Sequence, residues 1–161
     1  MASGDSLLAL DPLSNRPPAA NFATVDLRGE FVVLDFDDTT NEQAQFHAIV
    51  PSHYSGGDLK AVLTWTSSTA TSGSAKLKCE LTRLSAGVNL DALPSPDGSD
   101  EVTVAAPTTS GNLVVDLTGP ITVSGLTSGE TLRVVITRLA ADAGDTLVGD
   151  VELVSIELRE A

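Results

Sequence analysis

The chain alternates between short apolar segments and polar turns over most of its length. The apolar segments are rich in valine, leucine and threonine, and the turns are rich in glycine, proline, serine and aspartate. Most of these segments have the period of two that places successive side chains on opposite faces of a strand, and no helical period of useful length occurs. The pattern therefore predicts an all-β protein, an antiparallel β-sandwich.

About eight strands are predicted from this alternation. In 59–66 the side chains of Leu63 and Trp65 share the inward face, and in 75–84 Cys79 points inward as a small hydrophobe rather than as a nucleophile or ligand. The other predicted strands are 31–36, 44–50, 151–158 and the segments around Val104, Val115 and Val134.

The last predicted strand changes its apolar phase part of the way along. Val151 and Leu153 lie on one parity, whereas Val154, Ile156 and Leu158 lie on the other. A slip of one residue moves every following side chain to the opposite face of the sheet. Either a β-bulge lies near Leu153 and Val154, or both faces of this strand are covered, one of them by another subunit.

The first 30 residues differ from the body of the chain. A short apolar patch, Leu7, Leu8 and Leu10, precedes prolines that break regular structure next to Arg16. Such a segment is typical of an extended arm that becomes ordered when it docks on another protein surface. We therefore expect an N-terminal arm over 1–30 and one sandwich domain over 31–161. The candidate interface residues are Leu7, Leu8, Leu10 and Arg16.

Acidic side chains gather after the first strand of the body. Asp35, Asp37 and Asp38, with Thr39 and Glu42 following, form the densest cluster of hard oxygen ligands in the sequence. Their spacing lacks the pattern of a calcium-binding EF-hand loop, and a solvated strand end that caps the next turn needs no metal. The segment from Thr39 to Glu42 also fits a capping box that opens a single helical turn. No metal is assigned.

The charge balance excludes two classes of partner. Nine basic residues against twenty-two acidic residues give a formal net charge of -13, which repels phosphate backbones and anionic lipids. We expect no nucleic-acid partner and no membrane partner. The sequence shows neither a membrane-spanning stretch nor a secretory signal, so we expect the protein to be made in the cytoplasm.

No catalytic or cofactor-binding motif is present in the sequence. The patterns GxSxG, HExxH and CxxC and a phosphate-cradling glycine loop are all missing. His47 is on the outward parity of its strand and His53 lies in a turn, and two histidines make a poor site. The sequence therefore predicts a protein with no enzymatic activity and no cofactor.

Three arginines lie late in their predicted strands, namely Arg83, Arg133 and Arg138. A guanidinium group binds carboxylates in a planar, two-point geometry, which suits both buried pairs and pairs at interfaces. The sequence leaves open whether these three arginines pair within one subunit or across an interface.

Two stretches resemble a known family. Residues 34–63, LDFDDTTNEQAQFHAIVPSHYSGGDLKAVL, followed by TWTSSTATSG, and the closing segment TLRVVITRLAADAGDTLVGDVELVSIELRE resemble small proteins encoded among the virion structural genes of tailed bacteriophages. The shared elements define a fold and contain no catalytic motif. The resemblance implies a jelly-roll protein on the virion surface, a homotrimer bound to the major capsid protein. It would decorate and stabilise the capsid by bridging capsomers.

A carbohydrate-binding or receptor-binding module of a phage tail or fibre is the main alternative. Sandwiches that bind sugars often do so on a face lined by exposed aromatic rings. Here Trp65 has the parity of the core, and Tyr54, next to the Ser55-Gly56-Gly57 turn, is expected to anchor that turn. A third class, a polysaccharide-degrading enzyme, would need a pair of carboxylates in a cleft, which the sequence does not single out.

Overall fold

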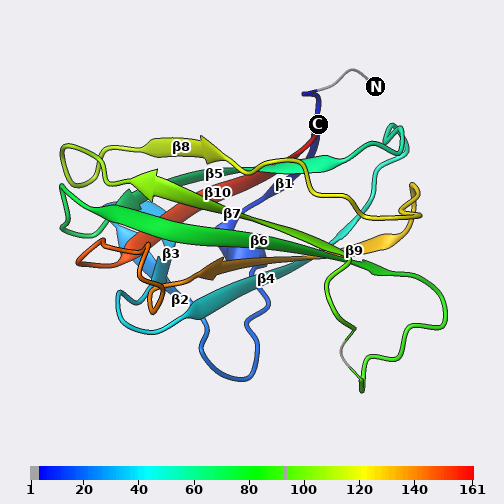
Figure 1. Ribbon diagram of the computed structural model, residues 1–161, viewed down its shortest axis with the longest axis horizontal. Coiled ribbons are helices and arrows are strands. Elements are labelled where there is room, and N and C mark those ends of the chain that lie inside the picture. Colours follow the sequence, from blue (N-terminus) through cyan, green and yellow to red (C-terminus); the bar gives the residue numbers. More distant parts are fainter. Residues whose placement is uncertain (1–3, 93) are drawn as a thin grey trace.

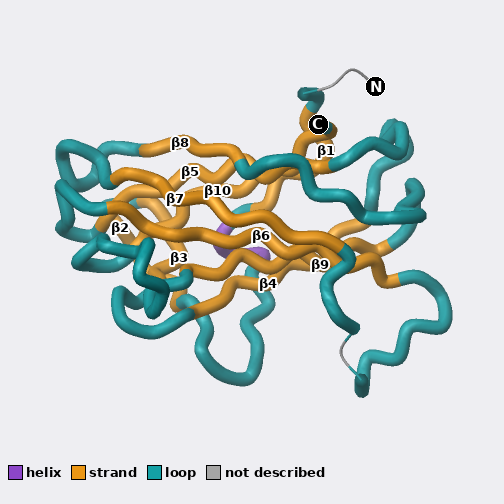
Figure 2. The backbone as a smooth tube through the Cα atoms, in the orientation of Figure 1, coloured by secondary structure: helices purple, strands orange, loops and turns teal. Residues whose placement is uncertain are grey.

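Ten β-strands and one short 3-10 helix make up the regular structure of residues 4–92 and 94–161, the parts of the chain that this computed structural model describes. The strands form two antiparallel sheets that pack face to face, with many loops at the two ends (Figures 1 and 2). In chain order the elements are β1 (Ser6–Leu10), η1 (Pro12–Ser14), β2 (Thr24–Arg28), β3 (Phe31–Phe36), β4 (Glu42–Ile49), β5 (Leu59–Ser67), β6 (Ser74–Leu84), β7 (Gly98–Ala105), β8 (Val114–Leu117), β9 (Thr131–Arg138) and β10 (Val151–Glu160).

The two sheets differ in size. The larger sheet has the strand order β2-β3-β10-β5-β8, and β1 is its sixth strand. Two strands pair with the same edge of β10. β3 pairs with residues 151–153 and β1 pairs with residues 156–159. The smaller sheet has the order β4-β9-β6-β7, so β9 lies in its interior between β4 and β6.

The core lies between the sheets and is built from every second residue of the strands. Trp65 of β5, Phe36 of β3 and Phe46 of β4 have no exposed side-chain surface. Cys79 of β6 is equally buried, and burial raises the pKa of its thiol to about 12, so it remains a neutral thiol. The inward positions predicted for Trp65 and Cys79 are confirmed.

The predicted all-β sandwich is confirmed, and all eight predicted strands are present. The predicted helical turn from Thr39 to Glu42 is wrong. The carboxylate of Asp37 accepts hydrogen bonds from the backbone N–H groups of Thr39 and Thr40, which closes a non-helical bend, and Glu42 already belongs to β4. Among the described residues, no helix has the length and hydropathy needed to cross a membrane.

The segment expected to be a separate arm is built into the sandwich over its described residues, 4–30. β1 pairs with β10 and β2 pairs with β3, so residues before 31 supply two strands of the larger sheet. Leu10 is 7% exposed, and Leu7 and Leu8 pack against the same core. The apolar patch has a core to join because β10, from the opposite end of the sequence, lies beside it. Contact of Leu7, Leu8, Leu10 or Arg16 with a second subunit stays a prediction.

The change of phase in the last strand is caused by a β-bulge. The register between β10 and β5 shifts between Leu153 and Ser155, which leaves Val154 without a partner on β5. Val151 and Leu153 before the bulge and Ile156 and Leu158 after it therefore all point into the core. Of the two explanations that the sequence left open, the bulge is the one observed.

Arg138, at the end of β9, is completely buried between the sheets. Its guanidinium forms a two-point ion pair with Asp145, with both N···O distances at 3.0 Å. It also donates to the carbonyl oxygens of Phe36 on β3, and of Leu147 and Gly149 on the loop before β10. One side chain thus connects the smaller sheet, the larger sheet and the loop 139–150. Arg138 therefore pairs within the chain.

We expect Arg138→Met to lower the free energy of unfolding by about 3–5 kcal/mol, because it leaves the Asp145 carboxylate buried without its partner. Urea unfolding followed by Trp65 fluorescence measures this loss. The double variant Arg138→Met/Asp145→Leu should recover much of it, since no charge remains buried. Equal losses in the single and double variants would contradict this explanation.

Candidate binding groove

The outer face of the smaller sheet is polar, although many of its side chains are covered. The register places outward side chains of β4, β9 and β6 in three rows across the strands. The rows are Gln43, Thr137 and Lys78; Gln45, Val135 and Glu80; and His47, Arg133 and Thr82.

Two hollows lie on this face, one toward each end of β9. The first, of about 440 Å³, is lined by Asn21, Gln43, Lys78, Glu80 and Thr137 among others. The second, of about 470 Å³, is lined by Gln45, His47, Arg133, Leu84 and Leu90 among others. Each volume is typical of a ligand pocket. We call the two hollows together with the β9 residues between them the β9 groove.

The middle of the β9 groove is shielded by its neighbours. Val135 faces away from the core, yet it is only 1% exposed. Its neighbours across the strands are Gln45 and Glu80, whose longer side chains stand on either side of it. From Thr131 to Thr137 the floor is roughly 20 Å long at the usual rise of a strand. The two hollows therefore lie along one strand, and an extended ligand that reaches both would cross the side chains that cover Val135.

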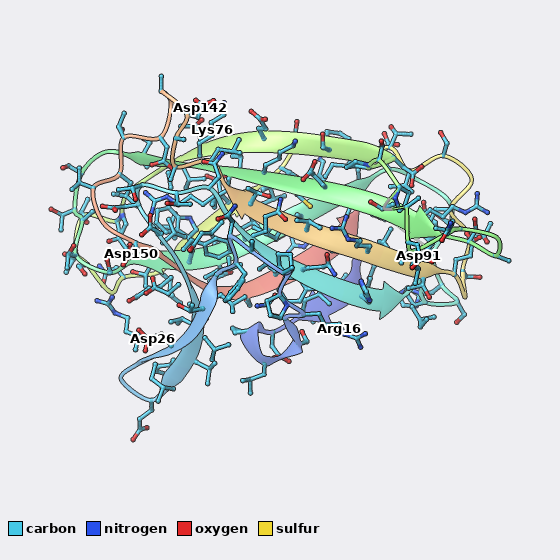
Figure 3. The ribbon with its side chains drawn as sticks, turned by 90° about the horizontal axis from the view of Figure 1, so that it is seen from below. Arg16, Asp26, Lys76, Asp91, Asp142 and Asp150 are labelled. Atoms are coloured by element: carbon cyan, nitrogen blue, oxygen red, sulfur yellow. The ribbon has the colours of Figure 1, made fainter. Side chains whose placement is uncertain are left out.

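The segment 15–23 forms the wall of the groove on the β4 side. The backbone N–H of Arg16 donates to the carbonyl oxygen of Gln45 (2.7 Å), and the Asn15 side chain accepts from the N–H of Gln45 (2.9 Å). Figure 3 shows Arg16 beside β4. Further along, Asn21 and Ala23 pair with the backbone of Gln43. Asn21 has a φ of 53°, a left-handed conformation that asparagine tolerates better than most residues.

A chain of polar contacts crosses the second hollow. Nε of Arg133 donates to Oε1 of Gln45 (2.9 Å), and Nε2 of Gln45 lies 3.3 Å from Nε2 of His47. On the other side of the imidazole, Nη1 of Arg16 lies 3.5 Å from Nδ1. Burial, together with the charges of Arg16 and Arg133, lowers the pKa of His47. The imidazole is therefore neutral at physiological pH.

Two hydroxyl groups on this face have no partner. Thr82 is 1% exposed and Thr137 is 5% exposed, and neither Oγ1 atom makes a hydrogen bond to the described part of the chain. Buried polar atoms of this kind are uncommon, because leaving one unpaired costs about 1–3 kcal/mol. Neither threonine stands out in the sequence, since their positions across β9 depend on strand pairing that a local pattern does not show.

The residues that the sequence considered for chemistry lie mostly elsewhere. His47 is in the groove, whereas His53 lies in an exposed turn with its Nε2 atom 3.4 Å from the carbonyl oxygen of Ser6. Tyr54 donates its hydroxyl to the carbonyl oxygen of Gly57 (2.6 Å), so its expected role as a turn anchor is confirmed. Trp65 is in the core.

The acidic cluster of Asp35, Asp37 and Asp38 is joined by Asp150, which the sequence did not place there. Carboxylate oxygens of Asp37, Asp38 and Asp150 all lie within 4.8 Å of one another, a spacing that a hard cation could bridge. Two of these carboxylates already accept backbone hydrogen bonds, Asp37 from Thr39 and Asp38 from the N–H of Gly149. The predicted capping role of Asp37 is thereby confirmed.

Asp35, beside this cluster, has a partly buried carboxylate with a raised pKa. Its Oδ1 atom is buried and lacks a hydrogen-bond partner among the described residues. Burial first, and then the neighbouring charges of Asp150 and Glu152, raise the pKa of Asp35 to about 6. The folded protein thus favours the protonated form of this side chain.

Apolar side chains gather on the outer face of the larger sheet. Val115 and Leu117 of β8, Leu113 just before it and Phe31 of β3 are between 43% and 72% exposed. The pairing of Val115 with Thr64 places both side chains on the side away from the core. A hollow of about 540 Å³ lies next to Phe31 and Leu113. We call these four residues the β8 face.

No family model and no curated protein matches this sequence. Solved structures with a similar fold include the CBM36-1 domain of a multidomain xylanase from the hindgut metagenome of Trinervitermes trinervoides (TM-score 0.56, 9% identity, 96% of this chain and 97% of that chain). Another is a family 11 carbohydrate-binding module from Clostridium thermocellum in complex with a β-1,3-1,4-mixed-linked tetrasaccharide (TM-score 0.53, 12% identity, 100% of this chain and 98% of that chain).

Part of an enzyme is also similar. An arabinose-bound α-L-arabinofuranosidase matches with a TM-score of 0.54 and 14% identity over 98% of this chain but only 26% of the enzyme chain. At such low identities these similarities establish the fold, a jelly-roll β-sandwich of the kind found in carbohydrate-binding modules.

We expect Asp35→Asn to raise the melting temperature more at pH 7.5 than at pH 4. The pKa of about 6 in the folded state exceeds the ordinary value of 3.8, so the stability that Asp35 contributes is lost as pH rises through this window. Allowing for solvent screening, the variant should gain about 1–2 kcal/mol at the higher pH. Thermal unfolding at both pH values checks this; an equal difference at the two would contradict it.

Proposed function

We propose that this protein is a non-catalytic carbohydrate-binding module that holds a glycan chain in the β9 groove. The observation that carries the proposal is the hollowed polar face itself, where Thr137, whose hydroxyl has no partner in the described chain, lines the first hollow. A hydroxyl that the protein leaves unpaired can be paired by a ligand, and sugars present many groups that both donate and accept hydrogen bonds.

The other side chains of the groove suit the same ligand. Gln43 and Gln45 offer amide donors and acceptors along the β4 side of the groove. At one end Leu84, Val88 and Leu90 provide an apolar contact for the C–H faces of sugar rings. Several hydrogen bonds combined with a small apolar surface are typical of sites that recognise polar molecules.

The fold supports this proposal over the other classes. The family 11 module with a similar fold was solved with a tetrasaccharide, and it matches over nearly its whole length. Hydrolysis of a glycosidic bond requires two carboxyl groups that flank the scissile bond. Glu80 is the carboxylate among the described residues that line the two hollows, and it is paired with Lys78 at 3.0 Å. We therefore propose binding without catalysis.

The tryptophan and the tyrosine contribute no stacking to the proposed binding. Trp65 is buried in the core and Tyr54 is held in its turn, so neither ring reaches the groove. Affinity then depends on hydrogen bonds with geometry fixed by β9 and its two neighbours. Loss of one such bond should have a measurable effect.

We expect Thr137→Val to weaken glycan binding about fivefold, because one net hydrogen bond of roughly 1 kcal/mol is lost. The same change should leave the fold as stable or make it more stable, since the Oγ1 atom has no partner in the protein. Affinity electrophoresis against a panel of soluble polysaccharides identifies the glycan, and calorimetry with its oligosaccharides then measures the dissociation constant.

Thr64→Val is the matched control for this experiment, because Thr64 is a partly buried threonine on the outer face of the opposite sheet. It should bind glycan as the unaltered protein does. The proposal is overturned if the protein binds none of the polysaccharides, or if Thr64→Val and Thr137→Val weaken binding equally.

A second candidate function, decoration of a phage capsid by a homo-oligomer, is favoured by the β8 face. Exposed apolar clusters on a sheet often mark a surface that packs against another protein. The family resemblance of the sequence and the acidic charge also agree with a position on the outside of a virion. In this proposal the β8 face packs against a second copy of the chain.

If the β8 face packs against another copy, the protein should sediment as an oligomer and Val115→Lys should convert it to a monomer with an unchanged melting temperature. Sedimentation velocity at several protein concentrations measures this. An unaltered protein that is already monomeric at high concentration would count against this candidate and leave the glycan-binding proposal intact.

A further inference from the structure

The positive charges at the β9 groove are unusual for so acidic a protein. The chain contains six arginines and carries a net charge of -13. Four of the arginines form ion pairs with carboxylates, namely Arg28, Arg83, Arg138 and Arg159. Within the described chain, the two arginines without a carboxylate partner are Arg16 and Arg133. Both belong to the polar contacts that cross the second hollow.

Arg133 is the better placed of the two for contact with a ligand. Its side chain stands in the row with His47 and Thr82 and lines the second hollow, and the residue is only 8% exposed. Nε is occupied by Gln45, whereas neither Nη nitrogen donates to any residue that the structure describes. Four N–H donors are thus left without protein acceptors. A largely buried guanidinium without a carboxylate is costly, and an anion bound from outside would lower this cost.

The groups around Arg133 compensate its charge only in part. The imidazole of His47 lies in the same row and is neutral. Burial lowers the pKa of Arg133 and the charge of Glu80, one row away, acts to raise it, but this carboxylate is already paired with Lys78 at 3.0 Å. Arg16 adds a second positive charge on the far side of His47. This end of the groove is therefore locally positive on a protein that is negative overall.

We infer that the glycan held by the β9 groove is acidic, and that the carboxylate of a uronic acid residue binds Nη1 and Nη2 of Arg133. This inference rests on the proposed carbohydrate-binding function. A planar carboxylate matches the two-point donor geometry of a guanidinium group better than a tetrahedral sulfate does. Arg16 then stabilises the same negative charge from the β4 side of the groove.

The overall charge of the protein favours a sparsely charged glycan over a dense polyanion. At long range a charge of -13 slows the approach of any anion, so attraction cannot come from the net field. A contact inside a partly covered hollow is screened less by salt than a surface pair is. Recognition thus takes place through one carboxylate of the glycan, the one that binds Arg133.

The test compares oligosaccharides of equal length by calorimetry with the full chain. The acidic probes are oligogalacturonate and oligoglucuronate, the neutral probes are the matching galactose and glucose oligomers, and a sulfated galactose oligomer tests the other common source of negative charge. We expect at least one uronate probe to bind about tenfold more tightly than its neutral counterpart. Arg133→Gln should weaken uronate binding far more than neutral binding and so remove this preference.

Two further variants separate a ligand contact from a structural role. Arg133→Lys keeps the charge but loses the two-point geometry, so it should retain only part of the preference. Arg159→Gln is the matched control, because Arg159 lies on the larger sheet and pairs with Glu157. It should bind like the unaltered protein, and melting temperatures confirm that all variants are folded.

The outcomes distinguish this inference from the function on which it rests. Equal binding of neutral and uronate probes overturns the inference and leaves glycan binding standing. A preference for the sulfated probe also overturns it, since the anion recognised is then not a carboxylate. If no probe binds and the polysaccharide panel is negative as well, both the inference and the proposed function fail.

Discussion

The buried guanidinium of Arg138 is the contact on which the arrangement of the sandwich depends. It is the point at which the smaller sheet, the larger sheet and the loop 139–150 are hydrogen-bonded to one side chain. Burial of an ion pair contributes little net stability, but it strongly penalises any arrangement that separates the partners. Arg138 and Asp145 therefore act mainly by disfavouring other strand registers, in which β9 would be shifted along β4 and β6. Since β9 is the floor of the groove, the same pair fixes the positions of Arg133 and Thr137.

The groove shows how a sandwich without obvious motifs can present a specific surface. Alternation along β9 gives its inner face to the core and its outer face to Thr131, Arg133, Val135 and Thr137. Neighbouring strands contribute amides on one side and an ion pair on the other. A segment from before the first predicted strand closes the β4 side. Each contribution comes from ordinary strand pairing, so a rigid scaffold holds the polar groups in place before any ligand arrives.

Local patterns predicted those features that depend on neighbouring residues. The strands from 31 to 160, the inward positions of Trp65 and Cys79 and the capping role of Asp37 all follow from alternation or turn chemistry. β1 was not predicted, because the apolar residues of β1 pair with a strand some 150 positions away. The groove was not predicted for the same reason, since Gln45, Arg133 and Thr82 share a face only through the register of three strands. Asp150 lies in the acidic cluster although it is far from Asp37 and Asp38 in the sequence, so a local pattern could not place it there.

The pairing of β1 with β10 has a consequence for the order in which the chain can fold. These strands come from opposite ends of the sequence, so their contact closes a loop that contains nearly the whole protein. Contacts of such long range tend to slow folding. During synthesis the inner strands can pair while β10 is still in the ribosome, but β1 must wait for it. Segment 15–23 follows β1 in the sequence, but its hydrogen bonds are made to β4. The wall of the groove can therefore form before the closing contact between β1 and β10.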